Sequence, residues 1–419
     1  MSGAHCLPER FDVSPEIRRR IGEDHDRFLH GLPPDLSSHV RDRYGFDLTG
    51  RYASRKIKIP FGKASGQLSM TTAEVRADGE AGLGFVVLKT VIAEDASGCR
   101  SMGAWAVPES RMRVEPITGV SGERGWTVTW QGRGWPGSFE KYLELVEEAV
   151  AAGRTADMLV VPSCKFHLPG GGEAWKVEEY QHTLSRIAAV WHRVQPDAPF
   201  ILEKDFSPTL AGTDAAAHRR TVLRWLGEVA GIIKSCCEVE LGVKVMNAVF
   251  EEAFQVEMLR ALLGAEVRPD FLVVANRLFD PERIFQGKKG IAYGGPDLGD
   301  RNLRVLSRAR FLEARGGFPS LPPISATGNV CSGRMALEYI LRGCTSCQMH
   351  TFFQVPASEY AMKEGARSSR VLHQLLFSPV NGLIAGMQFC RERWPDIFGT
   401  GELSITDLAS ACRNDAFCG

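Results

Sequence analysis

Short apolar runs alternate with amphipathic segments along the chain from residue 56 onward. Apolar positions spaced three and four residues apart predict helices, and near-continuous apolar runs of four to eight residues predict strands buried on both faces. Such strands are typical of a parallel sheet with helices on its faces. About eight strand-helix units in succession favour a (β/α)8 TIM barrel over an open, doubly wound sheet.

Nine runs qualify as strands, which is one more than a barrel uses. The weakest is Phe200–Lys204, which is either part of an insertion or not a strand. The family resemblance described below, which favours Lys244 over Lys204, implies that residues 200–237 are mostly an insertion. The expected strands are Ile57–Ala64, Gly84–Lys89, Trp126–Trp130, Asp157–Val161, Phe200–Lys204, Gly242–Met246, Phe271–Ala275, Ile324–Thr327 and Thr345–Met349. The expected helices include Phe139–Ala152, Val177–Trp191, His218–Lys234, Glu251–Leu263 and Arg334–Leu341.

The first 55 residues differ from the rest because they are polar, charged and rich in arginine. Helical stretches are expected at Pro15–Arg27 and Ser37–Tyr44. We therefore expect two parts in the chain. Residues 1–55 form an N-terminal helical extension packed on the main domain, and residues 56–419 form the barrel.

The composition is that of an ordinary globular protein, with 44% hydrophobic and 24% charged residues among 419. Fifty basic and fifty acidic side chains cancel, which argues against nucleic acid or an anionic membrane surface as a partner. No apolar run reaches the roughly 18 residues of a membrane span, and the first residues lack the apolar stretch of a signal peptide. We expect a cytoplasmic protein with no membrane partner that acts on a small molecule.

The number and spacing of the cysteines argue against disulfides and against a metal site. The 11 cysteines are an odd and scattered set, and cytosolic proteins usually keep such thiols buried and reduced. Cys344 and Cys347 have CxxC spacing, but they fall inside an apolar run, and no second ligand pair lies nearby to complete a zinc site. We therefore expect no metal site.

The stretch from residue 290 to 353 has the features of a phosphate site. Gly328 and Asn329 follow the expected strand Ile324–Thr327, where the backbone can turn tightly or adopt positive φ. Ser332 is suited to cap the next helix, and Thr351 follows the last strand closely. Turns after the last two strands of a barrel commonly bind phosphate through free N–H groups and helix N-termini.

This stretch resembles the dihydroorotate dehydrogenase family, including the C-terminal flavin domain of dihydropyrimidine dehydrogenases. The matching residues follow in the family's order and spacing. They are Tyr293-Gly294-Gly295, Thr327-Gly328-Asn329, Ser332-Gly333, Gly343 and His350-Thr351. The resemblance implies a TIM barrel that binds FMN, with its phosphate at these turns.

The resemblance extends upstream and covers roughly residues 56–355. It implies that Ala64 and Ser65 touch the flavin, that Lys89 and Thr90 lie beside its ring, and that Asn276 occupies the position of a family Asn. It also implies that Lys244 meets the pyrimidine edge of the ring, because its spacing to Asn276 resembles the family's. Lys204 competes with Lys244 for that role. A fixed Lys stabilises the negative charge that reduction places near N1 and O2.

The chain departs from the family where substrate is handled. Family members use a Cys or Ser in a loop after the fourth strand for proton transfer, and the corresponding stretch is taken to be Val161–His167. Cys164 is the candidate general acid or base, with a pKa lowered by Lys165 or His167. His167 is a rival proton donor, and a different group is a third alternative.

The pocket that would hold a pyrimidine differs as well. Trp130 or Gln131 falls where the family has an Asn, so of the family's ring-binding Asn residues only Asn276 has a clear counterpart. A site built for a polar ring loses much of its affinity when its hydrogen-bonding partners are replaced. Trp130, Gln131 and Asn276 are therefore the candidate substrate residues, and a non-pyrimidine substrate is favoured.

These features together predict an FMN-dependent oxidoreductase that acts on a CH–CH bond. Hydride would pass between flavin N5 and an activated carbon of a small substrate, with Lys89, Cys164 and His167 as the candidate catalytic residues. One alternative is a dihydroorotate or dihydropyrimidine dehydrogenase with divergent loops, and another is a barrel that binds a ligand without catalysis. The electron donor or acceptor and a homodimeric state are left open.

Overall fold

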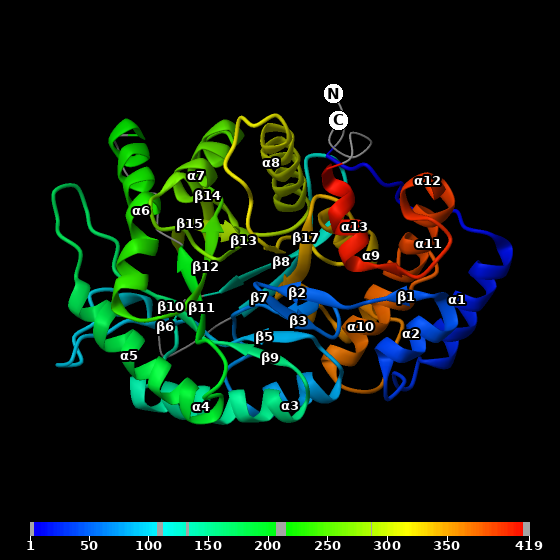
Figure 1. Ribbon diagram of the computed structural model, residues 1–419, viewed down its shortest axis with the longest axis horizontal. Helices are drawn as coiled ribbons and strands as arrows, with labels where there is room; N and C mark the ends of the chain where they lie inside the picture. The colour runs from blue at the N-terminus through cyan, green and yellow to red at the C-terminus, as the bar shows by residue number, and fades with distance from the viewer. Residues whose placement is uncertain (1–3, 107–111, 131–133, 207–214, 286, 414–419) are drawn as a thin grey trace.

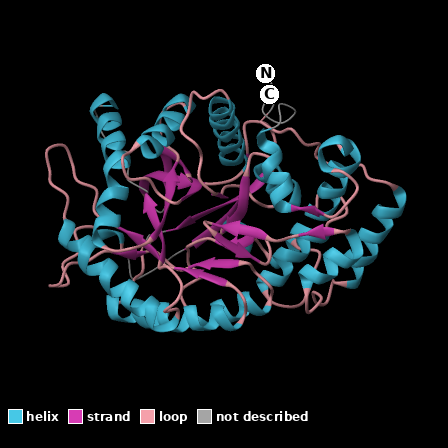
Figure 2. Cartoon of the chain, viewed as in Figure 1, coloured by secondary structure: helices cyan, strands magenta, loops and turns pink. Residues whose placement is uncertain are grey.

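The computed structural model describes residues 4–106, 112–130, 134–206, 215–285 and 287–413. In this part of the chain a curled parallel sheet lies at the centre, and helices surround it (Figures 1 and 2). The expectation of an α/β fold with a parallel sheet is confirmed. Among the described residues, no helix is both long and apolar enough to cross a membrane.

The main sheet has ten strands, and every neighbouring pair in it is parallel. Its order is β6-β10-β11-β12-β13-β16-β17-β4-β5-β9. The strands are β4 (Phe61–Lys63), β5 (Phe85–Val87), β6 (Val91–Ile92), β9 (Leu159–Val161), β10 (Ser163–Lys165), β11 (Ile201–Phe206), β12 (Glu240–Met246), β13 (Phe271–Asn276), β16 (Ile324–Ala326) and β17 (Cys344–Met349).

Two pairs of these strands follow each other closely along the chain. β5 and β6 are separated by residues 88–90, and β9 and β10 are separated by Pro162, which has no N–H to donate to a ladder. β5 pairs with β9 and β6 pairs with β10. The first strand of the sheet along the chain, β4, also pairs with the last, β17.

Helices alternate with the strands because capped amphipathic segments follow them. Ser138 accepts a hydrogen bond from the Lys141 N–H at the start of α4, and α4 buries a face that includes Tyr142, Val146 and Val150. The surrounding helices are α3 (Thr72–Glu80), α4 (Phe139–Thr155), α5 (Val177–Val194), α6 (Ala215–Cys236), α7 (Glu252–Gly264), α8 (Pro296–Ala314) and α9 (Gly333–Ile340).

Two sequence-based expectations about strands were wrong. The segment predicted as an insertion contains β11, which pairs with β10 on one side and β12 on the other, and α6 follows it. The described residues 201–206 and 215–236 are therefore a strand of the main sheet and the helix that comes next along the chain. The extra strand is instead at Trp126–Trp130, which belongs to β8 (Arg124–Trp130) and pairs antiparallel with β7 (Met112–Thr118) outside the main sheet.

A second antiparallel hairpin, β14 (Leu278–Phe285) with β15 (Lys288–Tyr293), follows β13 directly. The two hairpins are joined through side chains. Arg283 Nη2 donates to Glu115 Oε1 at 2.9 Å, and the Gly294 N–H donates to Thr127 Oγ1 at 3.0 Å. The hairpins therefore lie together beside the segment that leads into α8.

The N-terminal part contributes to the same core as the main sheet. Its helices are α1 (Pro15–Arg27) and α2 (Leu36–Tyr44), and α1 lies beside the C-terminal helices α10 (Arg367–Phe377) and α11 (Leu383–Arg393) in Figure 1. Small ladders complete this region, with β1 (Phe46–Asp47) parallel to β18 (Leu403–Ser404) and β2 (Gly50–Tyr52) antiparallel to β3 (Arg55–Ile57). The last described helices are α12 (Pro395–Phe398) and α13 (Ile405–Ser410).

Candidate functional site

A pocket lies where the strands of the main sheet end. It includes residues that directly follow β4, β16 and β17, and it encloses about 970 Å³ of empty space with its open mouth included. All twelve residues that the sequence selected for cofactor binding line it: Ala64, Ser65, Lys89, Thr90, Lys244, Asn276, Gly294, Gly295, Gly328, Asn329, His350 and Thr351.

One end of the pocket is made of glycine turns. Gly295 has a φ of +101° and precedes α8, and Gly328, two residues after the end of β16, has a φ of +112°. A Cβ at Gly328 would lie 2.7 Å from Asn302 Nδ2, which donates to the Ala275 and Thr327 carbonyls at 3.0 and 2.8 Å. Only glycine fits such a position. The turns therefore bring backbone close to the pocket at a helix N-terminus, which is the usual arrangement for binding an anion.

Lys244 is buried and held in place by a network of hydrogen bonds. Its Nζ donates to Glu203 Oε1 at 3.3 Å and to Gln348 Oε1 at 3.1 Å. Glu203 is fully buried and also accepts from Tyr52 Oη at 3.0 Å and Gln348 Nε2 at 2.9 Å. The network fixes the ammonium group at the pocket. Lys204, the rival candidate, is buried and is not among the lining residues.

Lys89 is 3% exposed and shares the pocket wall with Asp205 and Arg277. Burial lowers its pKa to about 8, and the nearby positive charges of Lys165 and Arg277 add to this, while Asp205 opposes it. Asp205 Oδ2 in turn forms an ion pair with Lys165 Nζ at 3.0 Å. Lys89 therefore exchanges a proton much closer to neutral pH than an ordinary lysine does.

This low pKa has a measurable consequence for stability. Between pH 8 and about 10.4, the usual pKa of lysine, unfolded Lys89 binds a proton that the folded protein does not. Unfolding therefore takes up a proton, and the free energy of unfolding rises with pH by up to about 1.4 kcal/mol per unit. Urea unfolding of the ligand-free protein across this range should show a smaller rise in Lys89→Met. Lys141→Met, at an exposed lysine, is the control, and equal slopes in all three proteins would refute the expectation.

A row of hydroxyl groups runs inward from the pocket wall. Ser65 Oγ is 2.8 Å from Thr90 Oγ1, which is 2.9 Å from Ser163 Oγ. The Thr90 N–H also donates to Ser65 Oγ at 2.9 Å, and Tyr142 Oη donates to the Ser163 carbonyl at 3.1 Å. These bonds tie the ends of β4 and β5 to β10 and so fix the positions of Ser65 and Thr90.

The structure places Cys164 and His167 away from this pocket. Cys164 is fully buried in β10, and burial raises its thiol pKa instead of lowering it. Its neighbours Ser163 and Lys165 make the contacts with Thr90 and Asp205, because successive residues of a strand face opposite sides. His167 Nε2 lies 3.2 Å from Glu173 Oε1, and neither residue is among those that line the pocket.

The register of the proton-transfer loop was therefore wrong. With β5 and β6, and likewise β9 and β10, counted as interrupted single strands, the fourth strand along the chain is β11, not the stretch that holds Cys164. The loop after β11 is residues 207–214, which lie outside the described residues.

The expected substrate residues are only partly placed. Asn276 lines the pocket at the end of β13. Trp130 ends β8, where its backbone pairs with Met112, and Gln131 lies outside the described residues. Trp126, four residues earlier on the same hairpin strand, is the described tryptophan of β8 that lines the pocket.

Several lining residues were missed by the sequence reasoning. Asp205, Arg277 and Gln348 all belong to or directly follow apolar runs. A charged or amide side chain inside a strand buried on both faces needs a partner, and that was the available signal. It was not used for Asp205 because its strand was taken for an insertion.

No protein-family model matches this chain, and no curated protein matches it.

Proposed function

We propose that this chain is an FMN-dependent oxidoreductase built on a closed (β/α)8 barrel. One observation carries the proposal: the residues chosen for FMN from a sequence resemblance come from seven separate segments, and all of them line a single pocket. Their convergence supports the resemblance as a whole.

Strand pairing supports the closed barrel. When β5 with β6, and β9 with β10, are each counted as one interrupted strand, the sheet has eight strands and each pairs with two neighbours. Such a sheet has no free edge. A pocket at the carboxyl ends of the strands is where barrel enzymes carry their active sites.

The glycine end of the pocket suits the phosphate group of FMN. Gly294 and Gly295 lead into α8, and Gly328, Asn329 and Thr351 come from the turns after β16 and β17. Backbone N–H groups and a helix N-terminus favour a dianion there. Gly295, Gly328, Asn329 and Thr351 would hold the phosphate, and Gly294, whose N–H already donates to Thr127 Oγ1, would leave room beside it.

Other lining residues suit the flavin ring and the reaction. Bound FMN would supply a hydride donor or acceptor for an activated C–C bond of a small, non-pyrimidine substrate. Lys244 would hold the polar edge of the ring, with Glu203 and Gln348 fixing its ammonium group. Ser65 and Thr90, locked together by their hydroxyl groups, would support the ring beside it.

Lys89 is the lining residue best suited to move a proton. Its pKa of about 8 allows both protonation states to be populated near neutral pH, which general acid or base catalysis requires. Asp205 shares the pocket wall and is held by Lys165. Lys89 and Asp205 therefore take the role in proton transfer that the sequence reasoning gave to Cys164.

The proposal is tested by the colour of the purified protein. We expect a yellow preparation with the two absorption bands of an oxidised flavin, and release of FMN by heat, identified by chromatography against FMN and FAD standards. A colourless protein that takes up no added FMN would instead favour a barrel that binds another ligand without redox chemistry. Bleaching of the bound flavin by dihydroorotate would favour the dihydroorotate dehydrogenase alternative over a non-pyrimidine substrate.

A further inference from the structure

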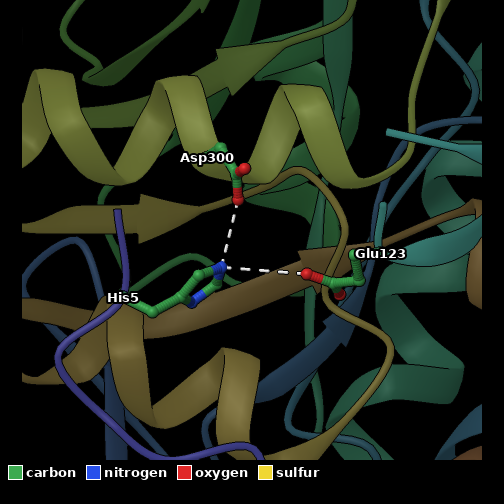
Figure 3. Close-up of side chains that lie close together, drawn as sticks. All are labelled: His5, Glu123 and Asp300. Atoms are coloured by element: carbon green, nitrogen blue, oxygen red, sulfur yellow. Dashed lines mark hydrogen bonds and ion pairs between the residues drawn. The ribbon is translucent and has the colours of Figure 1, made fainter. Parts of the chain in front are cut away.

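Three side chains from distant parts of the chain meet beside α8, away from the pocket described above. His5 comes from the N-terminal segment, Glu123 from the turn between β7 and β8, and Asp300 from the second turn of α8 (Figure 3). His5 Nε2 lies 3.0 Å from Asp300 Oδ1 and 3.8 Å from Glu123 Oε2. Their three ligand atoms all lie within 4.8 Å of one another.

These distances fit a small tetrahedral ion. A zinc ion with bonds of about 2.1 Å holds neighbouring ligand atoms about 3.4 Å apart, which lies between the two distances measured from His5 Nε2. The side chains are partly exposed, at 20% for His5, 15% for Asp300 and 36% for Glu123. Water can therefore reach the cluster and complete the coordination.

The other nitrogen of the His5 ring provides an independent indication. His5 Nδ1 lies 3.4 Å from Glu338 Oε1, an ion-pair contact without hydrogen-bond geometry, and the Glu338 side chain is fully buried. Glu338 is fixed in turn by the Leu7 N–H at 2.8 Å and by Arg342 Nη1 at 2.6 Å. A histidine that binds a metal usually directs its other nitrogen to such a carboxylate, which orients the ring and selects the tautomer.

We propose that His5, Glu123 and Asp300 bind one zinc ion, with Glu338 orienting His5 and water as the fourth ligand. The chemistry of one imidazole and two carboxylates suits Zn²⁺. No spacing motif marks this set in the sequence, because His5 and Asp300 are 295 residues apart. The proposal is independent of the flavin function.

The ion would link three parts of the chain: the N-terminal segment, the turn between β7 and β8, and α8. The hairpin turn already contacts α8 through the Val120 N–H, which donates to Asp297 Oδ1 at 2.7 Å. The N-terminal segment already contacts α9 through Glu338. Through Asp300, zinc would link the hairpin turn and the N-terminal segment to α8. Asp300 is five residues after Gly295, which lines the pocket. The metal is therefore expected to be structural and to raise the melting temperature.

The carboxylates raise the pKa of His5 to about 9 in the metal-free protein. An incoming ion must therefore displace a proton, which lowers its apparent affinity at neutral pH. Ion pairs without metal are the competing explanation for this cluster.

Calorimetric titration of ZnCl2 into the full chain distinguishes the two explanations, after treatment with a chelator and removal of any polyhistidine tag. We expect one zinc bound per chain, and at least about a 10-fold loss of affinity in His5→Ala and in Asp300→Asn. His30→Ala removes an exposed histidine that lies 3.4 Å from Glu364, and it should bind zinc like the parent. Circular dichroism of each variant establishes that it is folded.

The melting temperature gives a second readout. Zinc should raise it in the parent and in His30→Ala, and should leave it unchanged in His5→Ala. Zinc binding retained in either His5→Ala or Asp300→Asn, an equal loss in His30→Ala, or no binding by the parent would overturn the proposal and leave His5 as the cation of an ion-pair cluster.

Discussion

On the proposed function, replacing Gly294 with aspartate is expected to abolish FMN binding while the fold stays intact. A Cβ at this position would come no closer than 3.9 Å to Leu298 and 4.0 Å to Thr351, so the side chain has room and projects toward the pocket. Its carboxylate would then face the phosphate of FMN. Two like charges about 5 Å apart at an effective dielectric constant of about 20 repel by about 3 kcal/mol, which is a loss of more than 100-fold in affinity.

The measurement is the ratio of flavin to protein after gel filtration, together with the dissociation constant for added FMN. Gly171→Asp makes the same chemical change at an exposed loop glycine with no atom near its Cβ, and it should retain the parent's flavin content. Both variants should unfold at the same urea concentration as the parent. Normal FMN binding by Gly294→Asp would show that the phosphate does not lie at this end of the pocket.

Removing the carboxylate of Glu203 is expected to destabilise the protein by about 3–5 kcal/mol. Glu203→Ala would leave the buried ammonium group of Lys244 without its anion, and an unpaired buried charge carries a cost of this size. Tyr52 and Gln348 would lose a hydrogen-bond acceptor as well. The free energy of unfolding in urea, measured at pH 7, gives the difference directly.

A double substitution distinguishes the cost of the unpaired Lys244 charge from the cost of losing the packing of the Glu203 side chain. Glu203→Leu combined with Lys244→Met replaces the ion pair by apolar groups of similar volume, and it should recover much of the stability that Glu203→Ala loses. The exposed Glu257→Ala on α7 is the control and should change stability little. A double variant no more stable than Glu203→Ala would refute the role assigned to the unpaired charge. Because it lacks Lys244, it should also bind FMN more weakly.

Much of the secondary structure could be predicted from the sequence because capping residues and periodicity agree locally. α1 has the predicted bounds, Pro15–Arg27, since Pro15 begins the helix and the amphipathic pattern ends at Arg27. The hairpin at Trp126–Trp130 could not be recognised in the same way. A short apolar run does not reveal whether its partner is parallel or antiparallel, and the partner β7 shows no continuous apolar pattern.

Among the residues of the candidate site, those whose position depends on local geometry could likewise be predicted, and those that depend on strand register or pairing were harder to predict. Glycine turns are set by local backbone geometry, so Gly328 could be placed from the turn after its strand, whereas Gly295 was placed through the family resemblance. Which face a strand residue points to depends on register. Polar Ser163 and Lys165 alternate with apolar Cys164 and Phe166, and this alternation, which the sequence reasoning did not use, separates Cys164 from the face that carries Ser163 and Lys165. The ion pair of Asp205 with Lys165 joins two strands and becomes visible only when both are in one sheet.

The pairing of β4 with β17 also bears on how the chain folds during synthesis. Phe61 of β4 pairs with Cys347 of β17, and the Leu7 N–H donates to Glu338 across 331 residues of sequence. The ribosome therefore releases most of the chain before the partners of its first strand and of its first residues exist. Contacts of such high sequence separation form slowly. Until β17 emerges, the hydrogen-bonding edge of β4 that it will cover stays open, which makes this stage of synthesis the one most exposed to misassembly and most in need of protection by chaperones.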